Sequence, residues 1–207
     1  MFDYKNTEPV KETEWTRVYK WGDEYVYVSK FLEGDAEVSA ESIRERWPAF
    51  SFEQKLDFAQ AFSIGGNVTE EDERILDFLM EAGDPLIWMT IAFRLPHHRD
   101  KDRVLAFLLD RIGDDYEHKD NFFQALGLMK DQRAIPALRA TSDRYRERLA
   151  ASPASVPSDD YRQYLACCEA LWRISDSVEY KRVIEDALQS QDEAVRTIAE
   201  LILRNRV

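Results

Sequence analysis

The 207-residue sequence has no long hydrophobic run. Its longest apolar stretch, residues 86–93, is interrupted by Thr90 and followed by Arg94, so it falls short of the roughly 20 apolar residues that a membrane-spanning helix requires. The first residues also lack the apolar segment of a secretory signal peptide. We therefore expect no association with a membrane and a location in the cytoplasm.

Glycine and proline are scarce, with seven of each, and this scarcity disfavours an all-β sandwich, whose many turns use both residue types. Cysteine is scarcer still. The two cysteines, Cys167 and Cys168, are adjacent, which makes an ordinary disulfide between them implausible. Together with the missing export signal, they predict a reducing compartment and a role as small apolar core residues.

Positive charge is in deficit: the sequence has 28 lysines and arginines but 40 aspartates and glutamates, which gives a formal net charge of −12. Binding to nucleic acid or to an anionic lipid surface needs clustered Lys and Arg, so both are disfavoured. The surplus of carboxylates would instead attract a basic protein partner. A hydrophobic content of 44%, with 12% aromatics, is sufficient for a folded core.

Apolar residues recur at spacings of three and four from about residue 51 onward, which is typical of amphipathic helices. Start signals divide the pattern. Ser51 and Gln54 have the spacing of a capping box, and Asp84 followed by Pro85 is a typical helix start, whose apolar pattern continues to Leu95 before Pro96 ends it. Further helices are expected to start at Thr69 and Asp120, and Asp131 is expected to cap one that runs from about residue 132 to residue 150. The pattern predicts about nine helices of roughly 10–18 residues, joined by short turns and arranged in pairs.

A small residue marks the first helix of each pair. Successive markers are 31, 33, 45 and 29 residues apart, at Ala61, Ala92, Ala125, Ala170 and Ala199. The long interval contains a Pro/Ser-rich segment, residues 151–158, which we interpret as a loop. One helical hairpin per repeat, with a period in the low thirties, predicts an α-solenoid.

Three segments resemble a known repeat. Residues 125–138, Ala-Leu-Gly-Leu-Met-Lys-Asp-Gln-Arg-Ala-Ile-Pro-Ala-Leu, are similar to the HEAT-like motif also found in phycobilin lyases; residues 170–176 repeat its first half, and residues 192–199 resemble another piece of it. The resemblance is good over residues 120–207, weaker over 51–119 and absent from 1–50. It implies an all-α, right-handed α-solenoid of about four to five HEAT-like helical hairpins. Because the motif is architectural, it does not imply lyase activity.

The sequence thus predicts two parts: an N-terminal aromatic cap segment, residues 1–50, and a HEAT-like repeat domain, residues 51–207. In the cap, residues 26–29 have the composition of a strand and residues 21–24 that of a turn, which together are compatible with a β-hairpin. An irregular cap over the first repeat fits equally well, since a terminal solenoid repeat needs such cover. Residues 39–46 predict a short helix.

The resemblance places the second helix of each pair on the concave face of the solenoid. Polar positions on these helices are our candidate partner-binding residues: Glu73, Asp77, Glu81, Asp110, Arg111, Arg139, Asp143, Arg182 and Glu185. The first of them are acidic. They predict a non-enzymatic scaffold whose largely acidic concave face binds a basic protein, for example as an inhibitor or immunity protein.

Two other functions stay open. The first is a HEAT-like enzyme or ligand-binding solenoid, of lyase or DNA-glycosylase type, with a concave pocket that holds Trp88 and charged groups. In that case the basic patch Arg139, Arg144, Arg146 and Arg148 would contact phosphate or an acidic peptide; otherwise it is a solvated helix face. The second is an assembly subunit whose aromatic N-terminal segment docks on a neighbouring subunit.

The three histidines, His97, His98 and His118, lie near Asp100 and Asp102 and have the side chains of a zinc site. They lack regular ligand spacing, so we interpret them as solvated loop residues. No nucleophile motif or phosphate-binding glycine loop is present. We therefore predict no catalytic residue, no metal and no cofactor.

Overall fold

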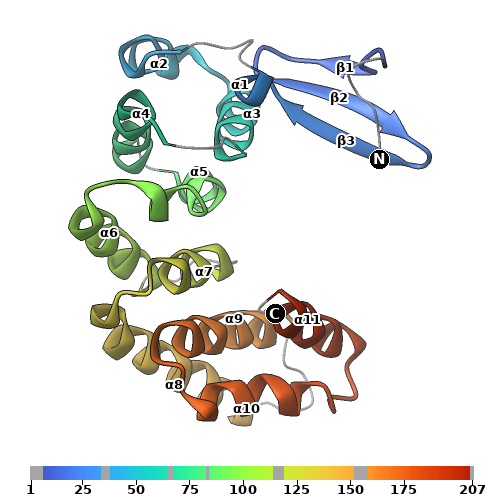
Figure 1. Ribbon diagram of the computed structural model, residues 1–207, viewed down its shortest axis with the longest axis vertical. Coiled ribbons are helices and arrows are strands. Elements are labelled where there is room, and N and C mark those ends of the chain that lie inside the picture. The colour runs from blue at the N-terminus through green and yellow to red at the C-terminus, as the bar shows by residue number, and fades with distance from the viewer. Residues whose placement is uncertain are drawn as a thin grey trace. The chain divides into compact units, whose positions relative to one another are not determined.

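The computed structural model describes residues 7–33, 38–64, 68–82, 84–113, 119–151 and 158–205. These residues are mostly helical: they form eleven α-helices and one three-stranded antiparallel sheet (Figure 1). The predominance of helix confirms the predicted secondary structure. The chain divides into two compact units, residues 1–99 and residues 100–207. Among the helices within the described ranges, none combines the length and the apolar character needed to cross a membrane.

The sheet lies at the start of the first unit. Its strands follow one another in the order β1 (Lys11–Glu12), β2 (Thr16–Trp21) and β3 (Glu24–Ser29). Between β2 and β3, Gly22 has a φ of +63°, which a residue without a Cβ adopts at no steric cost. Of the two alternatives left open for this segment, a hairpin and an irregular cap, the structure shows the hairpin. The sequence did not predict β1, because two residues are too few to show an alternating pattern.

Five helices complete the first unit: α1 (Lys30–Glu33), α2 (Ala40–Arg46), α3 (Phe52–Ser63), α4 (Glu70–Glu81) and α5 (Pro85–Ile91). The predicted start signals are confirmed at four of them, with caps at Ser39, Ser51, Thr69 and Asp84. Short 3₁₀ turns, η2 (Trp47–Ala49) and η3 (Leu95–His97), follow α2 and α5. Helix α3 packs against α5, and α2 against α4.

Helix α5 is shorter than predicted. The apolar pattern suggested a helix that continues to Leu95, but the structure ends it at Ile91 after seven residues. Pro96 supplies a physical reason, since proline lacks the N–H that continues a helix and disfavours helical backbone in the residue before it.

Aromatic residues join the cap to the first predicted repeat helix. Trp15 is only 3% exposed, and its ring stacks on Phe31 with a centroid separation of 5.8 Å. Both rings meet Phe58 edge-on, at 5.1 and 5.8 Å. Residues from both sides of the boundary predicted at residue 50 therefore share one core.

Six helices form the second unit: α6 (Lys101–Gly113), α7 (Asp120–Met129), α8 (Ile135–Ala151), α9 (Ser158–Ser175), α10 (Val178–Ala187) and α11 (Glu193–Arg204). The described residues after residue 50 thus contain nine α-helices, as predicted. Helix α9 packs against α7, α8, α10 and α11, and α6 packs against α7 and α8. Of the predicted loop at residues 151–158, residues 152–157 lie outside the described ranges.

Helix α7 opens at Asp120, as predicted, and Lys119 is its N-cap. The next helix start differs from the prediction. Asp131 caps a 3₁₀ turn, η4 (Gln132–Ala134), which leads into α8. Since Pro136 follows Ile135, a tighter turn before the helix is compatible with the missing N–H of proline.

Small residues allow the helices to approach closely. The repeat markers are all buried, at 0–1% exposure: Ala61, Ala92, Ala125, Ala170 and Ala199. A Cβ added to Gly127 on α7 would lie 3.2 Å from the Cα of Ala170 on α9. The Ala-Leu-Gly stretch of the repeat motif is therefore located where two helices touch.

Candidate functional site

Two of the three predicted acidic residues on α4 contact neighbouring side chains and backbone of their own unit. The Glu73 carboxylate, 12% exposed, accepts a hydrogen bond from the backbone N–H of Arg99 at 2.8 Å. Asp77 Oδ1 lies 3.4 Å from Nε2 of His98, whose side chain is 5% exposed. These two carboxylates therefore help to hold α4 against the segment that follows α5.

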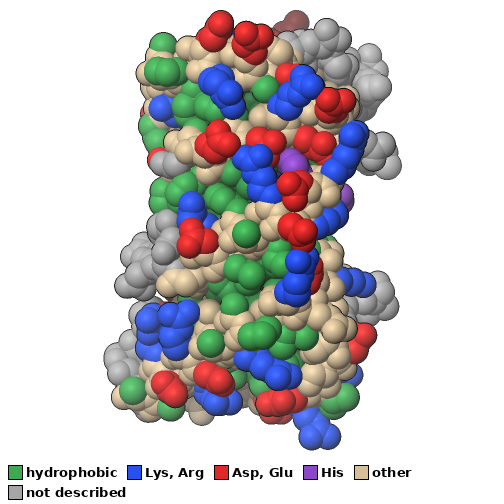
Figure 2. Space-filling view, turned by 90° about the vertical axis from the view of Figure 1, so that its left-hand side faces the viewer, with side chains coloured by type: hydrophobic (Ala, Val, Ile, Leu, Met, Phe, Trp, Pro, Cys, Tyr) green, Lys and Arg blue, Asp and Glu red, His purple; other side chains and the backbone are tan. Residues whose placement is uncertain are grey.

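Glu81, the third, is presented to solvent. Its side chain is 62% exposed, and its carboxylate lies 4.0 Å from the guanidinium of Arg44 on α2. Because α2 and α4 pack side by side, Glu81 belongs to the same surface as Glu41 and Glu45, the exposed glutamates of α2. Together the two helices carry eight carboxylates and three arginines, a formal net charge of −5. We call this surface the α2–α4 face. Figure 2 shows acidic side chains alternating with basic ones on the side of the molecule where these helices lie.

Asp110 and Arg111 form a separate pair on α6. The Arg111 guanidinium contacts the Asp110 carboxylate and lies 4.9 Å from the centroid of the Phe107 ring. The Asp110 side chain is 71% exposed. This pair thus presents one exposed carboxylate beside a partly covered guanidinium.

Arg139 and Asp143 are brought together by α8. They line a cavity of about 330 Å³ between α8, α9 and α10, with Arg146, Tyr164 and Tyr180. The Arg139 Nε donates a hydrogen bond to the Tyr180 hydroxyl at 3.2 Å, and Arg146 pairs with Asp143 at 2.7 Å. With Glu179, which also lines it, the cavity combines two guanidinium groups, two carboxylates and two phenols. We call it the α8–α10 cavity.

Arg182 and Glu185, the last two predicted residues, lie on α10 outside the lining of this cavity. Glu185 pairs with Lys181 one turn earlier at 2.9 Å, and Arg182 is exposed. The nine predicted residues thus belong to several separate surfaces within the two units.

Two buried thiols lie beneath the α8–α10 cavity. Both cysteines are free and buried, as expected for core residues. Cys168 Sγ lies 3.8 Å from the Ser142 hydroxyl, and the Cys167 thiol donates to the carbonyl oxygen of Leu138 at 3.2 Å. Burial raises the pKa of Cys168 to about 11 and also raises that of Cys167. Both sulfurs are therefore neutral at pH 7, and neither is activated as a nucleophile.

The arginines of the predicted basic patch on α8 contact other side chains of the second unit. Besides the contacts of Arg139 and Arg146, Arg144 donates to the Thr141 hydroxyl at 3.1 Å, and Arg148 contacts the Asp160 carboxylate at 3.4 Å. These contacts favour the interpretation of the patch as a solvated helix face.

The histidines do not converge on a metal-binding geometry in the part of the chain that the structure describes. His97 is exposed, as expected of a solvated residue. The same expectation was wrong for His98, which is buried beside Asp77, and His118 lies outside the described residues. Asp100 accepts from the backbone N–H of Arg103 at 3.0 Å, and Asp102 pairs with Arg133 at 2.7 Å. Within the described ranges, no group of three or more His, Cys, Asp and Glu side chains is placed to hold a metal ion.

A larger cavity lies between the sheet and α3. It has a volume of about 590 Å³ and is lined by Thr16, Val18 and Tyr27 of the sheet and by residues of α3 that include Glu53 and Asp57. We call it the sheet–helix groove. None of the candidate partner-binding residues lies in this groove, although the spacing of Glu53 and Asp57 puts both carboxylates on one face of a helix.

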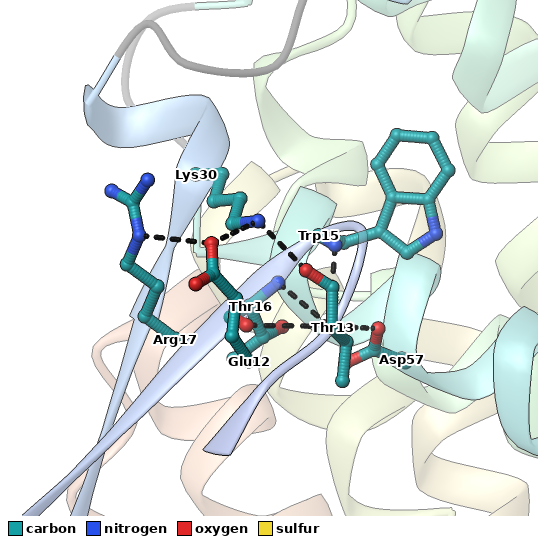
Figure 3. Close-up of polar contacts among 7 residues, drawn as sticks. All are labelled: Glu12, Thr13, Trp15, Thr16, Arg17, Lys30 and Asp57. Carbon is teal, nitrogen blue, oxygen red and sulfur yellow. Dashed lines mark hydrogen bonds and ion pairs between the residues drawn. The ribbon is translucent and has the colours of Figure 1, made fainter. Parts of the chain in front are cut away.

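Hydrogen bonds fix the wall of this groove (Figure 3). The Thr13 hydroxyl donates to Asp57 Oδ2 at 2.6 Å and accepts from the backbone N–H groups of Trp15 and Thr16 at 3.2 and 2.9 Å. Lys30 Nζ donates to the Thr13 carbonyl at 2.7 Å. The segment between β1 and β2 is therefore tied both to α3 and to the start of α1.

Glu12 completes the same network. Its carboxylate contacts Lys30 Nζ at 2.6 Å and Arg17 Nε at 3.3 Å. The hydrogen bond and charge of Lys30, followed by those of Arg17, hold the pKa of Glu12 below its ordinary value. The charges of Lys30 and Arg17 are therefore balanced, at least in part, by the Glu12 carboxylate.

Comparisons with protein-family models, with curated proteins and with solved structures found no match.

Proposed function

We propose that this chain is a non-enzymatic helical-repeat scaffold that binds a basic protein through the α2–α4 face. The observation that carries the proposal is the excess of exposed carboxylates on these two adjacent helices. Four are exposed, Glu41, Glu45, Glu70 and Glu81, against two exposed arginines, Arg44 and Arg74. An inhibitor or immunity protein that covers a basic toxin or enzyme is one form of this function. In a cytoplasmic setting, a carboxylate-rich surface attracts a basic partner and speeds its association.

The packing of the helices supports a HEAT-like solenoid as the architecture of the scaffold. In the second unit, the predicted first helices of successive repeats contact one another in chain order, α7 with α9 and α9 with α11, while α6 contacts α8. In the first unit, α3 contacts α5 and α2 contacts α4. Stacked helical hairpins of this kind are typical of α-solenoids. We propose a right-handed solenoid of four to five hairpins.

The exposed carboxylates identify the residues to change. Glu41 and Glu81 are exposed, and the Glu70 side chain, which pairs with Arg74, is 67% exposed. Substituting the three residues with glutamine removes three charges and no buried contact. A matched control replaces three exposed glutamates of the second unit, Glu147, Glu193 and Glu200.

The experiment is an affinity capture from the native host lysate at low and high salt, followed by a binding measurement on the captured protein. We expect one stoichiometric basic protein that is released as the ionic strength rises. The triple variant of the α2–α4 face should weaken its binding, and the control variant should not. Equal loss in the two variants, or a partner that is indifferent to salt, would contradict the proposal.

The α8–α10 cavity supports a second candidate, a ligand-binding solenoid. Its cationic, anionic and phenolic groups converge on a space of about 330 Å³, which is within the size range of small-molecule sites. Native mass spectrometry of the purified protein tests this function. A retained small molecule that is lost on Arg139→Gln and Tyr180→Phe substitution would place ligand binding ahead of partner binding.

A further inference from the structure

We propose that the sheet–helix groove binds the guanidinium group of an arginine side chain that is presented by a partner protein. The groove adjoins the α2–α4 face, since Arg46 of α2 donates to the carboxylate of Glu14, which lines the groove. It adds a specific pocket to a surface that otherwise attracts by charge. The inference goes beyond the proposed function, and its test does not depend on the identity of the natural partner.

The charge of the groove is the first argument. Four charged residues line it, Lys11, Glu14, Glu53 and Asp57, and Glu14 is paired with Arg46. Glu53 and Asp57 lie four residues apart on α3, so that their like charges repel. Within the described residues, no ion pair joins either carboxylate to a lysine or an arginine. A cation bound between them would remove this repulsion and form charge-assisted hydrogen bonds with two acceptors.

Thr16 is the second and independent argument. Its side chain lines the groove, and the residue is only 5% exposed. Among the residues that the structure describes, the Thr16 hydroxyl has no hydrogen-bond partner, and its oxygen is not fully enclosed, so it stays open to the groove. The register pairs Thr16 with Ser29 and Val18 with Tyr27, which places Thr16, Val18 and Tyr27 on one face of the sheet. The Thr16 oxygen is thus an acceptor aimed into the groove.

The shape of the groove favours arginine over a simpler cation. Tyr27 is 62% exposed and offers an aromatic face on which a planar guanidinium stacks. Val18 and Leu56, which also line the groove, would cover the aliphatic part of the side chain. A guanidinium carries five N–H donors in a fixed plane, which suits two carboxylates and a hydroxyl. An ammonium group has three donors and does not stack in the same way.

The groove is also already ordered, since the Thr13 hydroxyl holds the Asp57 carboxylate at 2.6 Å. Little conformational freedom is therefore lost when a cation binds, and this makes a single side chain a usable probe.

The test is a titration of the ¹⁵N-labelled full chain with two short peptides, followed by NMR. Each peptide has one central residue flanked by glycine and serine; this residue is arginine in the first peptide and citrulline, its neutral isostere, in the second. We expect the arginine peptide to shift the amide signals of Thr16, Tyr27 and Asp57, and the citrulline peptide to bind at least about ten times more weakly.

Variants locate the binding. Glu53→Gln combined with Asp57→Asn keeps the side-chain shapes and leaves an oxygen that accepts from Thr13, and we expect it to raise the Kd of the arginine peptide about tenfold. The matched control, Glu193→Gln with Glu200→Gln on α11, should leave the Kd unchanged. Thr16→Val should weaken binding less than the charge variant does.

Three outcomes would overturn the inference: equal binding of the two peptides, signal shifts confined to other surfaces, or equal effects of the groove and control variants. Failure of the groove is distinguishable from failure of the proposed function. If the natural partner binds the glutamine variant of the α2–α4 face more weakly but binds the groove variant as tightly as the unmodified chain, the scaffold function stands and the groove inference falls.

Discussion

The buried ion pair between Arg94 and Asp72 provides a stringent test of the first unit. Arg94 is 5% exposed, and its Nη2 lies 3.0 Å from Asp72 Oδ2. Its Nη1 donates to the carbonyl oxygen of Phe62, and the guanidinium lies 4.0 Å from the centroid of the Phe62 ring. Burial lowers the pKa of Arg94, and the charge of Asp72 opposes that shift. We predict that Asp72→Ala is strongly destabilising.

The magnitude follows from two losses. Removing one partner of a buried ion pair leaves an uncompensated charge, at a cost of about 3–5 kcal/mol. Asp72 also accepts from the backbone N–H of Thr69 at 2.8 Å in the capping box of α4, and the loss of a cap costs about 1 kcal/mol. We therefore expect Asp72→Ala to lower the free energy of unfolding by about 4–6 kcal/mol.

The opposite substitution, Arg94→Met, should cost less, about 1–3 kcal/mol. Methionine fills the apolar site, and the remaining Asp72 carboxylate is 19% exposed and keeps its contact with Thr69. Urea unfolding at pH 7 gives the two free energies, and hydrogen exchange of the α4 and α5 amides shows whether the first unit is the one affected. A loss below about 1 kcal/mol for Asp72→Ala, or a larger loss for Arg94→Met, would refute the reasoning.

Three further results are expected. Gly127→Val should destabilise by about 1–3 kcal/mol in thermal unfolding, because an added Cβ lies 3.2 Å from Ala170 Cα; Gly113→Ala, where a Cβ meets nothing within 4 Å, should be neutral or slightly stabilising. Burial raises the pKa of Cys168 to about 11 and that of Tyr145 to about 12, so the folded state keeps these protons up to a higher pH than the unfolded chain does. Stability should therefore be full below about pH 8.5 and fall between about pH 9 and 12 in urea unfolding followed against pH; constant stability over that range would contradict the burial of these groups. Finally, a thiol reagent at pH 8 should react with both cysteines only as fast as the chain opens, so that adding denaturant speeds the reaction; rapid labelling of the native protein would exclude a buried role.

Local signals predicted the helices well because they act within a few residues. The side chains of Ser51 and Thr69 bond to backbone groups three positions ahead, and Asp84 caps α5 directly before Pro85. Such contacts are present in any local segment with the right spacing. At Gly22 the local signals were compatible with the hairpin but did not distinguish it from an irregular cap.

The sheet–helix groove was not predictable, because its walls come from distant parts of the chain. The hydrogen bond between Thr13 and Asp57 joins residues 44 positions apart. The α8–α10 cavity likewise depends on the contact between Arg139 and Tyr180, 41 positions apart. A sequence pattern identifies which side chains face away from a helix, but it does not show which second element will meet them.

The acidic residues of α4 show why charge alone did not define the partner surface. Sequence reasoning treated Glu73 and Glu81 alike, yet Glu73 is 12% exposed and bonded to Arg99, whereas Glu81 is 62% exposed. A largely covered carboxylate that accepts a backbone hydrogen bond contributes to stability, and an exposed one is available to a partner. We therefore expect Glu73→Ala to lower the free energy of unfolding by about 1–3 kcal/mol and Glu81→Ala to change it by less than about 0.5 kcal/mol. Binding of a basic partner should respond in the opposite order, once the comparison is made at a temperature where both variants are folded. If the two substitutions had equal effects on unfolding, the distinction between structural and partner-binding carboxylates on this helix would be wrong.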